Sequence, residues 1–189
     1  IRALYILFMK KLIKNFATKY LAVSQEAHKS VHTGEVDKGK LDILYCGIKH
    51  LEKVKRDREL RVEFGIKDTE LVLGHVGRMS EPKNHEFLLQ IFMSLKTSIP
   101  AKLVLVGDGE LREKVTNLID EFDLASDVIM LGARADAVDI MASVFDVIAF
   151  PSLYEGLPLT VVEAQAVGVP ILVADNITKE AEFNSDCVA

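Results

Sequence analysis

Two acidic residues lie on either side of a turn that is suited to binding an anion. Glu155 precedes Pro158 and Glu163 follows it. Pro158 suits the first turn of a helix, because its missing N–H is not needed there and its φ is already helical. A helix that begins here would aim the free amides of Leu159 and Thr160 outward from the preceding strand. These amides and the helix dipole attract an anion, and phosphate is the usual one.

The two carboxylates are suited to hydroxyl groups on neighbouring carbons. A carboxylate accepts two hydrogen bonds side by side, so one glutamate could hold a ribose and the other a sugar. Gly156, next to Glu155, lets a ligand approach the backbone closely. The alternative for Glu163 is a solvent-facing position, which we disfavour because small and apolar residues surround it. These neighbours are Val161, Val162, Ala164 and Ala166.

Two cations follow a predicted strand. Arg78 and Lys83 lie in the loop after the apolar run Leu71–Val76. Cations at the carboxyl end of a strand, across from a helix N-terminus, can clamp a diphosphate from both sides. The alternative is a pair of solvated loop cations.

A glycine pattern invites a dinucleotide interpretation. Gly107 and Gly109 follow a predicted strand, but Arg112 replaces the third glycine of G-x-G-x-x-G. That replacement would hinder the close helix–strand packing of the fingerprint. We interpret the pattern as a tight turn on the wall of a ligand cleft. Gly132 and Arg134 occupy the carboxyl end of the next predicted strand.

Short apolar runs alternate with longer amphipathic segments, which predicts an α/β fold. The expected architecture is a Rossmann-like parallel sheet with helices on both faces. The predicted strands are Tyr20–Ser24, Leu41–Cys46, Leu71–Val76, Lys102–Gly107, Val128–Leu131, Val147–Phe150 and Pro170–Ala174.

Two helices are predicted from their periodicity. The first spans Asn84–Lys96 and the second Glu110–Phe122. The first has a single apolar stripe. Its members are Phe87, Leu88, Ile91, Phe92 and Leu95.

A charged segment divides the chain. Residues 51–61 have little apolar periodicity, so we place a domain junction near residue 50, with one unit over 1–50 and another over 51–189. The first unit has two predicted strands, too few for an independent sheet. It resembles the tail of a domain, and we expect the chain to be a piece of a longer protein.

The charge balance and the cysteine content of the chain argue against some classes of partner and ligand. The 189 residues include 23 basic and 28 acidic side chains, which argues against a nucleic-acid partner. The 2 cysteines form no metal pattern, and we expect a reducing compartment, the cytoplasm. A basic face near the amino end is expected to be solvated, with contact to the inner face of the cytoplasmic membrane as the alternative. It consists of Lys10, Lys11, Lys14 and Lys19.

The motifs together resemble a known enzyme family. Residues 151–170 fit P-S-x-x-E-G-x-P-x-x-x-x-E-A-x-A-x-G-x-P, which is similar to the donor-site motif of glycosyltransferase family 4. This family contains retaining enzymes of the GT-B fold and belongs to the group 1 glycosyl transferases. The likeness covers nearly the whole chain in the family's order. Its other parts are Tyr20–Ser24, Val76–Arg78, Lys83–Asn84, Leu105–Gly109, Leu131–Gly132, Phe145–Val147 and Gly168–Pro170.

The resemblance implies a function for each motif. The chain would be the carboxyl-terminal, nucleotide-sugar-binding domain of an enzyme that transfers a sugar from a nucleoside diphosphate, UDP by preference, to a glycan, lipid or small-molecule acceptor. Arg78 and Lys83 would neutralise the leaving diphosphate, Glu155 would orient the donor sugar and Glu163 the ribose. These implied catalytic residues are Arg78, Lys83 and Glu155. The implied donor-binding residues are Gly77, Arg78, Lys83, Gly107, Gly132, the backbone of Arg134, Glu155, Gly156, Leu157, Pro158, Leu159, Thr160 and Glu163.

No cofactor is implied. No two aspartates lie two positions apart, so the Asp-x-Asp metal clamp of the other large glycosyltransferase fold is absent, and we expect no metal. One departure from the family is Cys46-Gly47-Ile48-Lys49, where Asn-Gly-Ile-Asp is usual. Two alternatives stay open: a dinucleotide-binding oxidoreductase or epimerase, with Asp127 near the spacing of its ribose-binding acid, and a non-catalytic nucleotide-binding domain. The chain alone is expected to bind nucleotide weakly and to transfer little or no sugar.

Overall fold

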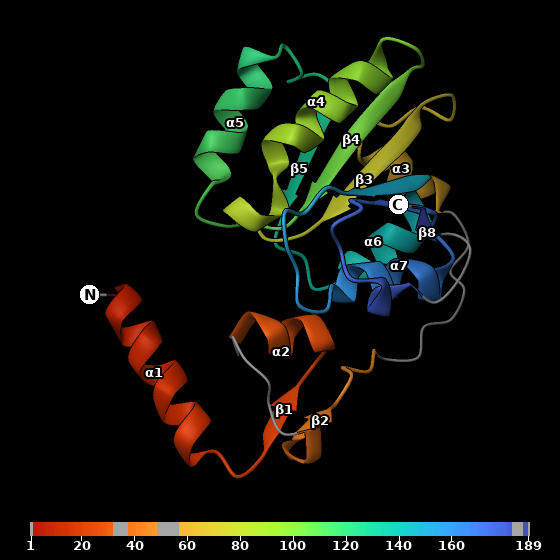
Figure 1. The fold of residues 1–189 in the computed structure, drawn as a ribbon. Helices are drawn as coiled ribbons and strands as arrows, with labels where there is room; N and C mark the ends of the chain where they lie inside the picture. The colour runs from red at the N-terminus through yellow and green to blue at the C-terminus, as the bar shows by residue number, and fades with distance from the viewer. Residues whose placement is uncertain (1, 32–37, 49–56, 183–186, 189) are drawn as a thin grey trace.

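A six-stranded parallel sheet with helices on both faces makes up the larger part of the molecule (Figure 1). The computed structural model describes residues 2–31, 38–48, 57–182 and 187–188. The strand order is β5-β4-β3-β6-β7-β8, which confirms the predicted α/β class. The strands are β3 (Leu71–Val76), β4 (Ala101–Val106), β5 (Val128–Gly132), β6 (Val147–Phe150), β7 (Ile171–Val173) and β8 (Cys187–Val188). The helices are α3 (Arg58–Glu63), η2 (Glu81–Lys83), α4 (His85–Lys96), α5 (Arg112–Glu121), α6 (Ala137–Val144), α7 (Leu159–Val167) and η3 (Lys179–Ala181).

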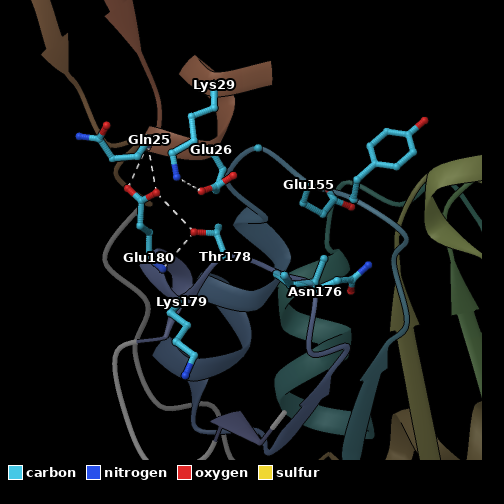
Figure 2. Close-up of a pocket in the computed structure, with 11 residues that line it drawn as sticks. Gln25, Glu26, Lys29, Glu155, Asn176, Thr178, Lys179 and Glu180 are labelled. Carbon is cyan, nitrogen blue, oxygen red and sulfur yellow. Dashed lines mark hydrogen bonds and ion pairs between the residues drawn. The ribbon is translucent and has the colours of Figure 1, made fainter. Parts of the chain in front are cut away.

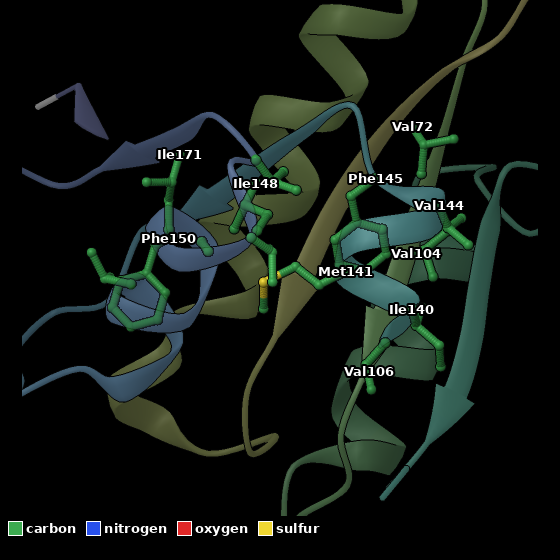
Figure 3. Packing of buried hydrophobic residues seen from close by; sticks show 14 of the residues in the cluster. Val72, Val104, Val106, Ile140, Met141, Val144, Phe145, Ile148, Phe150 and Ile171 are labelled. Carbon is green, nitrogen blue, oxygen red and sulfur yellow. The ribbon is translucent and has the colours of Figure 1, made fainter. Parts of the chain in front are cut away.

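Two apolar cores lie on the two faces of this sheet. Side chains alternate along a strand, so Val72 and Leu73 of β3 enter different cores. α4 and α5 cover the core that contains Leu73, while α3, α6 and α7 cover the core that contains Val72. Figure 3 shows Met141 and Phe145 among the buried side chains of the second core. Burial on both faces explains why the strands are continuous apolar runs.

The predicted helices form with small differences. α4 begins after Asn84, which has a left-handed φ of 53°. Its buried side chains include Leu88, Leu89 and Phe92. Phe87, which the apolar stripe placed inward, is 49% exposed. The other predicted members of the stripe pack against the core, and Leu89 is buried in addition, so the buried face of the helix is turned away from Phe87 toward Leu89.

The charged segment divides the two predicted units only in part. Asp57 caps α3 by accepting hydrogen bonds from the amides of Glu59 and Leu60. Arg61 on this helix is 2% exposed and forms an ion pair with Asp146, just before β6. The helix therefore belongs to the larger sheet. The predicted junction near residue 50 falls within 49–56, which lie outside the described residues.

A smaller unit precedes this sheet. It contains α1 (Arg2–Phe16), β1 (Tyr20–Ala22), α2 (Gln25–Val31), η1 (Lys38–Lys40) and β2 (Leu41–Ile43). β1 and β2 pair in parallel as a two-stranded sheet, and α2 is the element nearest the larger unit (Figure 1). Several apolar side chains of α1 are exposed, namely Leu4, Tyr5, Ile6, Leu7, Phe8 and Phe16.

Candidate functional site

The candidate site lies where the order of the strands in the sheet reverses. β3 and β6 are neighbours at the centre of the sheet, and from them the chain progresses to opposite edges. Loops that follow two such strands diverge and leave a crevice at the carboxyl ends, where α/β proteins bind ligands. The loop 77–84 follows β3 and the loop 151–158 follows β6. The motifs predicted to hold a diphosphate and a sugar therefore meet at this crevice.

An ion pair joins the two loops. Lys83 Nζ lies 2.7 Å from Glu155 Oε1, and the side chains are 16% and 17% exposed. Lys83 Nζ also lies 4.6 Å from the centre of the Phe150 ring, a distance typical of a cation–π contact. Lys83 is therefore not a solvated loop cation.

Backbone and amide hydrogen bonds hold the same loops together. The amide of Leu153 donates to the carbonyl of Pro82 at 2.7 Å. The side-chain amide of Asn84 donates to the carbonyl of Pro151 at 3.3 Å. The left-handed conformation of Asn84 thus ends one loop while its side chain contacts the other.

Arg78 occupies the exposed rim of this crevice. Its guanidinium is 73% exposed and lies 3.1 Å from a carboxylate oxygen of Glu110, in the loop after β4. An exposed pair of this kind contributes little stability, so Arg78 can exchange Glu110 for a phosphate. Lys83 is fixed on one side of the crevice, whereas Arg78 is accessible on the rim.

The glycine pattern after β4 is explained by packing. Gly107 has a φ of +143°, and a Cβ there would lie 1.9 Å from the carbonyl oxygen of Gly77. A Cβ at Gly109 would lie 2.4 Å from the carbonyl oxygen of Met79. Both glycines therefore let the loop after β3 approach the loop after β4. The close approach explains the two glycines, and the role of this turn as a wall of the donor cleft stays a prediction.

The next wall is the end of β5. The carbonyl of Gly132 accepts a hydrogen bond from the amide of Gly107 at 2.8 Å. The Arg134 side chain binds both carboxylate oxygens of Asp136, at 2.8 and 2.7 Å. The predicted contact of the Arg134 backbone with a ligand stays a prediction.

The start of α7 differs slightly from the expectation. Pro158 is the N-cap, with an extended ψ of 97°, and Leu159 is the first helical residue. Pro158 therefore lies one position before the helical turn that was predicted to contain it. No side chain caps this end, and the first amides of a helix have no partner within it. The Thr160 hydroxyl donates to the carbonyl of Val76 at 3.4 Å, which joins α7 to the end of β3.

Glu163 lies in the second turn of α7 and is half-buried. Burial raises the pKa of its carboxyl above the ordinary value. Within the described residues its carboxylate has no hydrogen-bond or ion-pair partner. The buried position that the sequence favoured for Glu163 is thus reached only in part, and Ala166 beside it is exposed.

Three buried polar side chains beneath the loops were not predicted as a group. His75 and His85 meet edge to face, with ring centres 4.9 Å apart, and Ser152 is fully buried. His75 Nδ1 contacts the carbonyl of Ala149 at 2.9 Å. Burial lowers the pKa of His75 to about 3 and that of His85 to about 4. Both histidines therefore pack beneath the loops and are not solvated.

A cavity of about 930 Å³ adjoins the crevice and extends to α2 (Figure 2). Glu155 and Gly156 line it from the larger unit, and Gln25 lines it from the smaller one. Glu180 joins the two sides, because its carboxylate accepts hydrogen bonds from the amide of Gln25 at 3.0 Å and the hydroxyl of Tyr45 at 3.1 Å. Sequence reasoning missed Glu180, since no motif connects it with residues 135 positions away.

No metal cluster accompanies these groups in the part of the chain that the structure describes. Among the same residues, no helix is long and apolar enough to cross a membrane. The acid proposed for a dinucleotide, Asp127, precedes β5 and so lies at the amino ends of the strands, away from the crevice at their carboxyl ends, and Lys102 pairs with it there at 2.9 Å. The dinucleotide alternative therefore lacks its ribose contact.

Comparison with known proteins identifies the family of this chain. Residues 56–188 match the family model described as glycosyl transferases group 1. The chain belongs to this family. It is 42% identical to the putative glycosyltransferase EpsF of Bacillus subtilis over 125 residues, which cover 66% of this chain and 32% of EpsF. It is 32% identical to the UDP-Gal:alpha-D-GlcNAc-diphosphoundecaprenol alpha-1,3-galactosyltransferase of Escherichia coli, with 74% of this chain and 38% of that protein covered.

Solved structures show the same fold for this group 1 glycosyl transferase. Anabaena HepE in complex with UDP-glucose superimposes with a TM-score of 0.80 at 22% identity, covering 97% of this chain and 52% of HepE. WaaG, described as a glycosyltransferase involved in lipopolysaccharide biosynthesis, superimposes with a TM-score of 0.74 at 24% identity, covering 86% of this chain and 46% of WaaG. The chain spans about a third of the length of the curated relatives it matches and about half of these solved chains.

Proposed function

We propose that this chain supplies the donor site of a retaining glycosyltransferase that moves a sugar from a UDP-sugar to a glycan, lipid or small-molecule acceptor. The observation that carries the proposal is the meeting of Lys83 and Glu155 at the switch point between β3 and β6. HepE, a structural relative, was solved with UDP-glucose, and the E. coli relative is named for UDP-Gal. The proposal that the anomeric configuration is retained rests on the resemblance of the sequence motifs to family 4.

The diphosphate is assigned to the cations at the crevice. When the bond between the sugar and the diphosphate breaks, its electron pair remains on the diphosphate oxygen. Arg78 and Lys83, together with the first amides of α7, would stabilise this charge. Stabilisation of charge that develops in the transition state is usually the largest catalytic term. Arg78, which is exposed, would reach the diphosphate from the rim of the crevice, and Lys83 would reach it from inside the crevice.

The remaining parts of the donor are assigned along the crevice. Glu155 would accept hydrogen bonds from the sugar hydroxyls and Glu163 from the ribose. The backbone at Gly132 and Arg134 would contact the edge of the base. Gly77, Gly107, Gly156, Leu157 and Pro158 would shape the backbone around the diphosphate.

We propose that donor binding needs no divalent metal, because Arg78, Lys83 and the first amides of α7 would already supply positive charge to the diphosphate. Calorimetric titration of UDP with EDTA and with Mg²⁺ or Mn²⁺ tests this. Equal affinity under these conditions is expected, whereas binding that appears only with metal would contradict the metal-free site.

The acceptor and the cellular place are further proposals. The acceptor, a glycan or a lipid-linked molecule, would contact parts of the enzyme beyond this chain, so the chain alone would transfer little or no sugar. We place the enzyme in the cytoplasm, with the basic face of Lys10, Lys11, Lys14 and Lys19 available to the inner face of the membrane.

The ligand class is tested most directly by titrating UDP, GDP, ADP and NAD against the chain. Tightest binding of UDP is expected. Tightest binding of NAD would instead support an oxidoreductase, and nucleotide binding with no transfer by the full-length enzyme would support a non-catalytic sensor.

A further inference from the structure

Ser24 is a buried polar residue of the smaller unit that contacts the candidate donor site. Its side chain is fully buried. Its hydroxyl donates to the carbonyl of Gly156 at 2.6 Å and accepts a hydrogen bond from the amide of Ala27 at 2.9 Å. The first bond spans 132 positions in the sequence and the second caps α2. A single hydroxyl thus joins α2 to the loop that carries Glu155.

Gly156 is shaped for this contact. A Cβ at Gly156 would lie 3.2 Å from the Cβ of Ala27, which is closer than most such contacts. Glycine therefore lets α2 approach the loop closely. Figure 2 shows Glu26 of α2 and Glu155 beside the same cavity.

A second contact keeps α2 in place beside this loop. The backbone amide of Gln25 donates to both carboxylate oxygens of Glu180, at 3.0 and 3.1 Å. The Thr178 hydroxyl also donates to this carboxylate. Because Gln25 follows Ser24 directly, the amide and the hydroxyl fix neighbouring atoms of one helix end. The Ser24 hydroxyl that donates to Gly156 is therefore itself held in place.

The loop needs such a restraint. Glycine has more accessible backbone conformations than any other residue, so a loop that contains Gly156 loses more entropy when it is fixed. A hydrogen bond to the Gly156 carbonyl selects one orientation of that peptide. Glu155 is bonded directly to Gly156, so the same restraint limits where its carboxylate can lie relative to Lys83.

We propose that Ser24 is a positioning residue for Glu155, which it orients through the carbonyl of Gly156. This inference rests on the proposed role of Glu155 toward the donor sugar. Ser24 does not touch the donor itself. Its loss should reduce recognition of the sugar while leaving the nucleotide contacts at Arg78 and Lys83 in place.

The test compares Ser24→Ala with a matched control in this chain. Ser143 is also buried and its hydroxyl also donates to a carbonyl at 2.6 Å, that of Asp139, but it lies on α6. UDP and UDP-glucose are titrated by calorimetry. Ser24→Ala should lower the preference for UDP-glucose over UDP about threefold to tenfold, as expected for one hydrogen bond, and Ser143→Ala should leave it unchanged. Equal weakening of both ligands by Ser24→Ala would mean a merely structural role and would overturn the inference.

Two further measurements separate this inference from the proposed function. Glu155→Gln should abolish the preference, and adding Ser24→Ala to it should cause no further loss, because both changes act on one contact. If Glu155→Gln removes the preference and Ser24→Ala does not, the role of Glu155 stands and that of Ser24 is wrong. If Glu155→Gln changes nothing, the role of Glu155 is wrong.

Hydrogen exchange tests the positioning without a ligand. Loss of the α2 cap alone would speed exchange only within α2, whereas the positioning role predicts faster exchange also in residues 153–160. Unchanged exchange in 153–160 overturns the inference whatever the titrations give.

Discussion

Lys83 and Glu155 are paired with each other at 2.7 Å, although the sequence assigns one to a diphosphate and the other to a sugar. Both side chains are mostly buried, and Phe150 covers the ammonium from one side. In the proposed donor site, a nucleoside diphosphate would therefore share or replace Glu155 as the partner of Lys83. The diphosphate and the sugar of a nucleotide sugar would then be recognised by the two members of one ion pair, Lys83 and Glu155.

This coupling gives the first prediction. Glu155→Gln removes the competing anion, so UDP should bind up to about fivefold more tightly, the equivalent of about 1 kcal/mol for an ion pair. The advantage of UDP-glucose over UDP should disappear, because an amide oxygen accepts more weakly and its NH₂ confronts another donor. Calorimetry with both ligands measures this, and equal weakening of the two would contradict separate roles.

Arg78→Ala tests the more exposed of the two cations, Arg78 and Lys83, that are proposed to bind the diphosphate. Loss of a hydrogen bond to a charged group costs about 1.5–3 kcal/mol, so UDP affinity should fall about tenfold to a hundredfold. Uridine, which lacks the diphosphate, should bind as before. Arg58→Ala is the matched control, since Arg58 is an exposed arginine that pairs with Asp68 instead. A similar loss for uridine would assign Arg78 to the base or to the fold.

Much of the fold was predictable because the strands of a covered parallel sheet are short apolar runs. β3 and β6 were predicted with the observed bounds. The position of Phe87 was not, because helical periodicity leaves the edges of an apolar stripe undefined. Short elements such as α3 also escaped prediction, since a six-residue helix has too few turns to show a period.

The site was predictable where neighbouring residues along the chain act together. Gly107 and Gly109 indicated a tight turn from their spacing, and the close approach of the loop after β3 explains both. Contacts between distant residues were not predictable. The sequence placed Ser24 at the end of a predicted strand, but its bond to Gly156 depends on how α2 meets the larger unit.

The buried histidines predict how stability depends on pH. Burial lowers the pKa of His75 to about 3 and that of His85 to about 4. The unfolded chain, with an ordinary histidine pKa of about 6.5, therefore takes up these protons first as the pH falls. Stability should drop below pH 6.5 and keep dropping toward the folded pKa values. Each histidine should account for about 2 kcal/mol between pH 7 and pH 5.

Urea denaturation at pH 7 and pH 5 measures this loss. In His85→Gln the difference between the two pH values should shrink by about half, because one of the two groups no longer titrates. The comparison uses the pH difference within each variant, so a change in overall stability does not affect it. An unchanged difference would mean that His85 is not the group responsible.

Glu163 gives the last prediction, because it distinguishes the ribose from the rest of the donor. Glu163→Gln should weaken the binding of UDP, whose 2′- and 3′-hydroxyls would donate to the carboxylate in the proposed site, and should weaken the binding of 2′-deoxy-UDP much less. Burial raises the pKa of Glu163, so its charge costs stability at neutral pH. The substitution removes that charge and should not lower the urea midpoint at pH 7, so weaker binding could not be attributed to unfolding. Titration of both nucleotides against the wild-type and variant chains is the measurement. If the two nucleotides lose affinity equally, Glu163 does not contact the ribose hydroxyls, and the half-buried carboxylate must serve another part of the ligand.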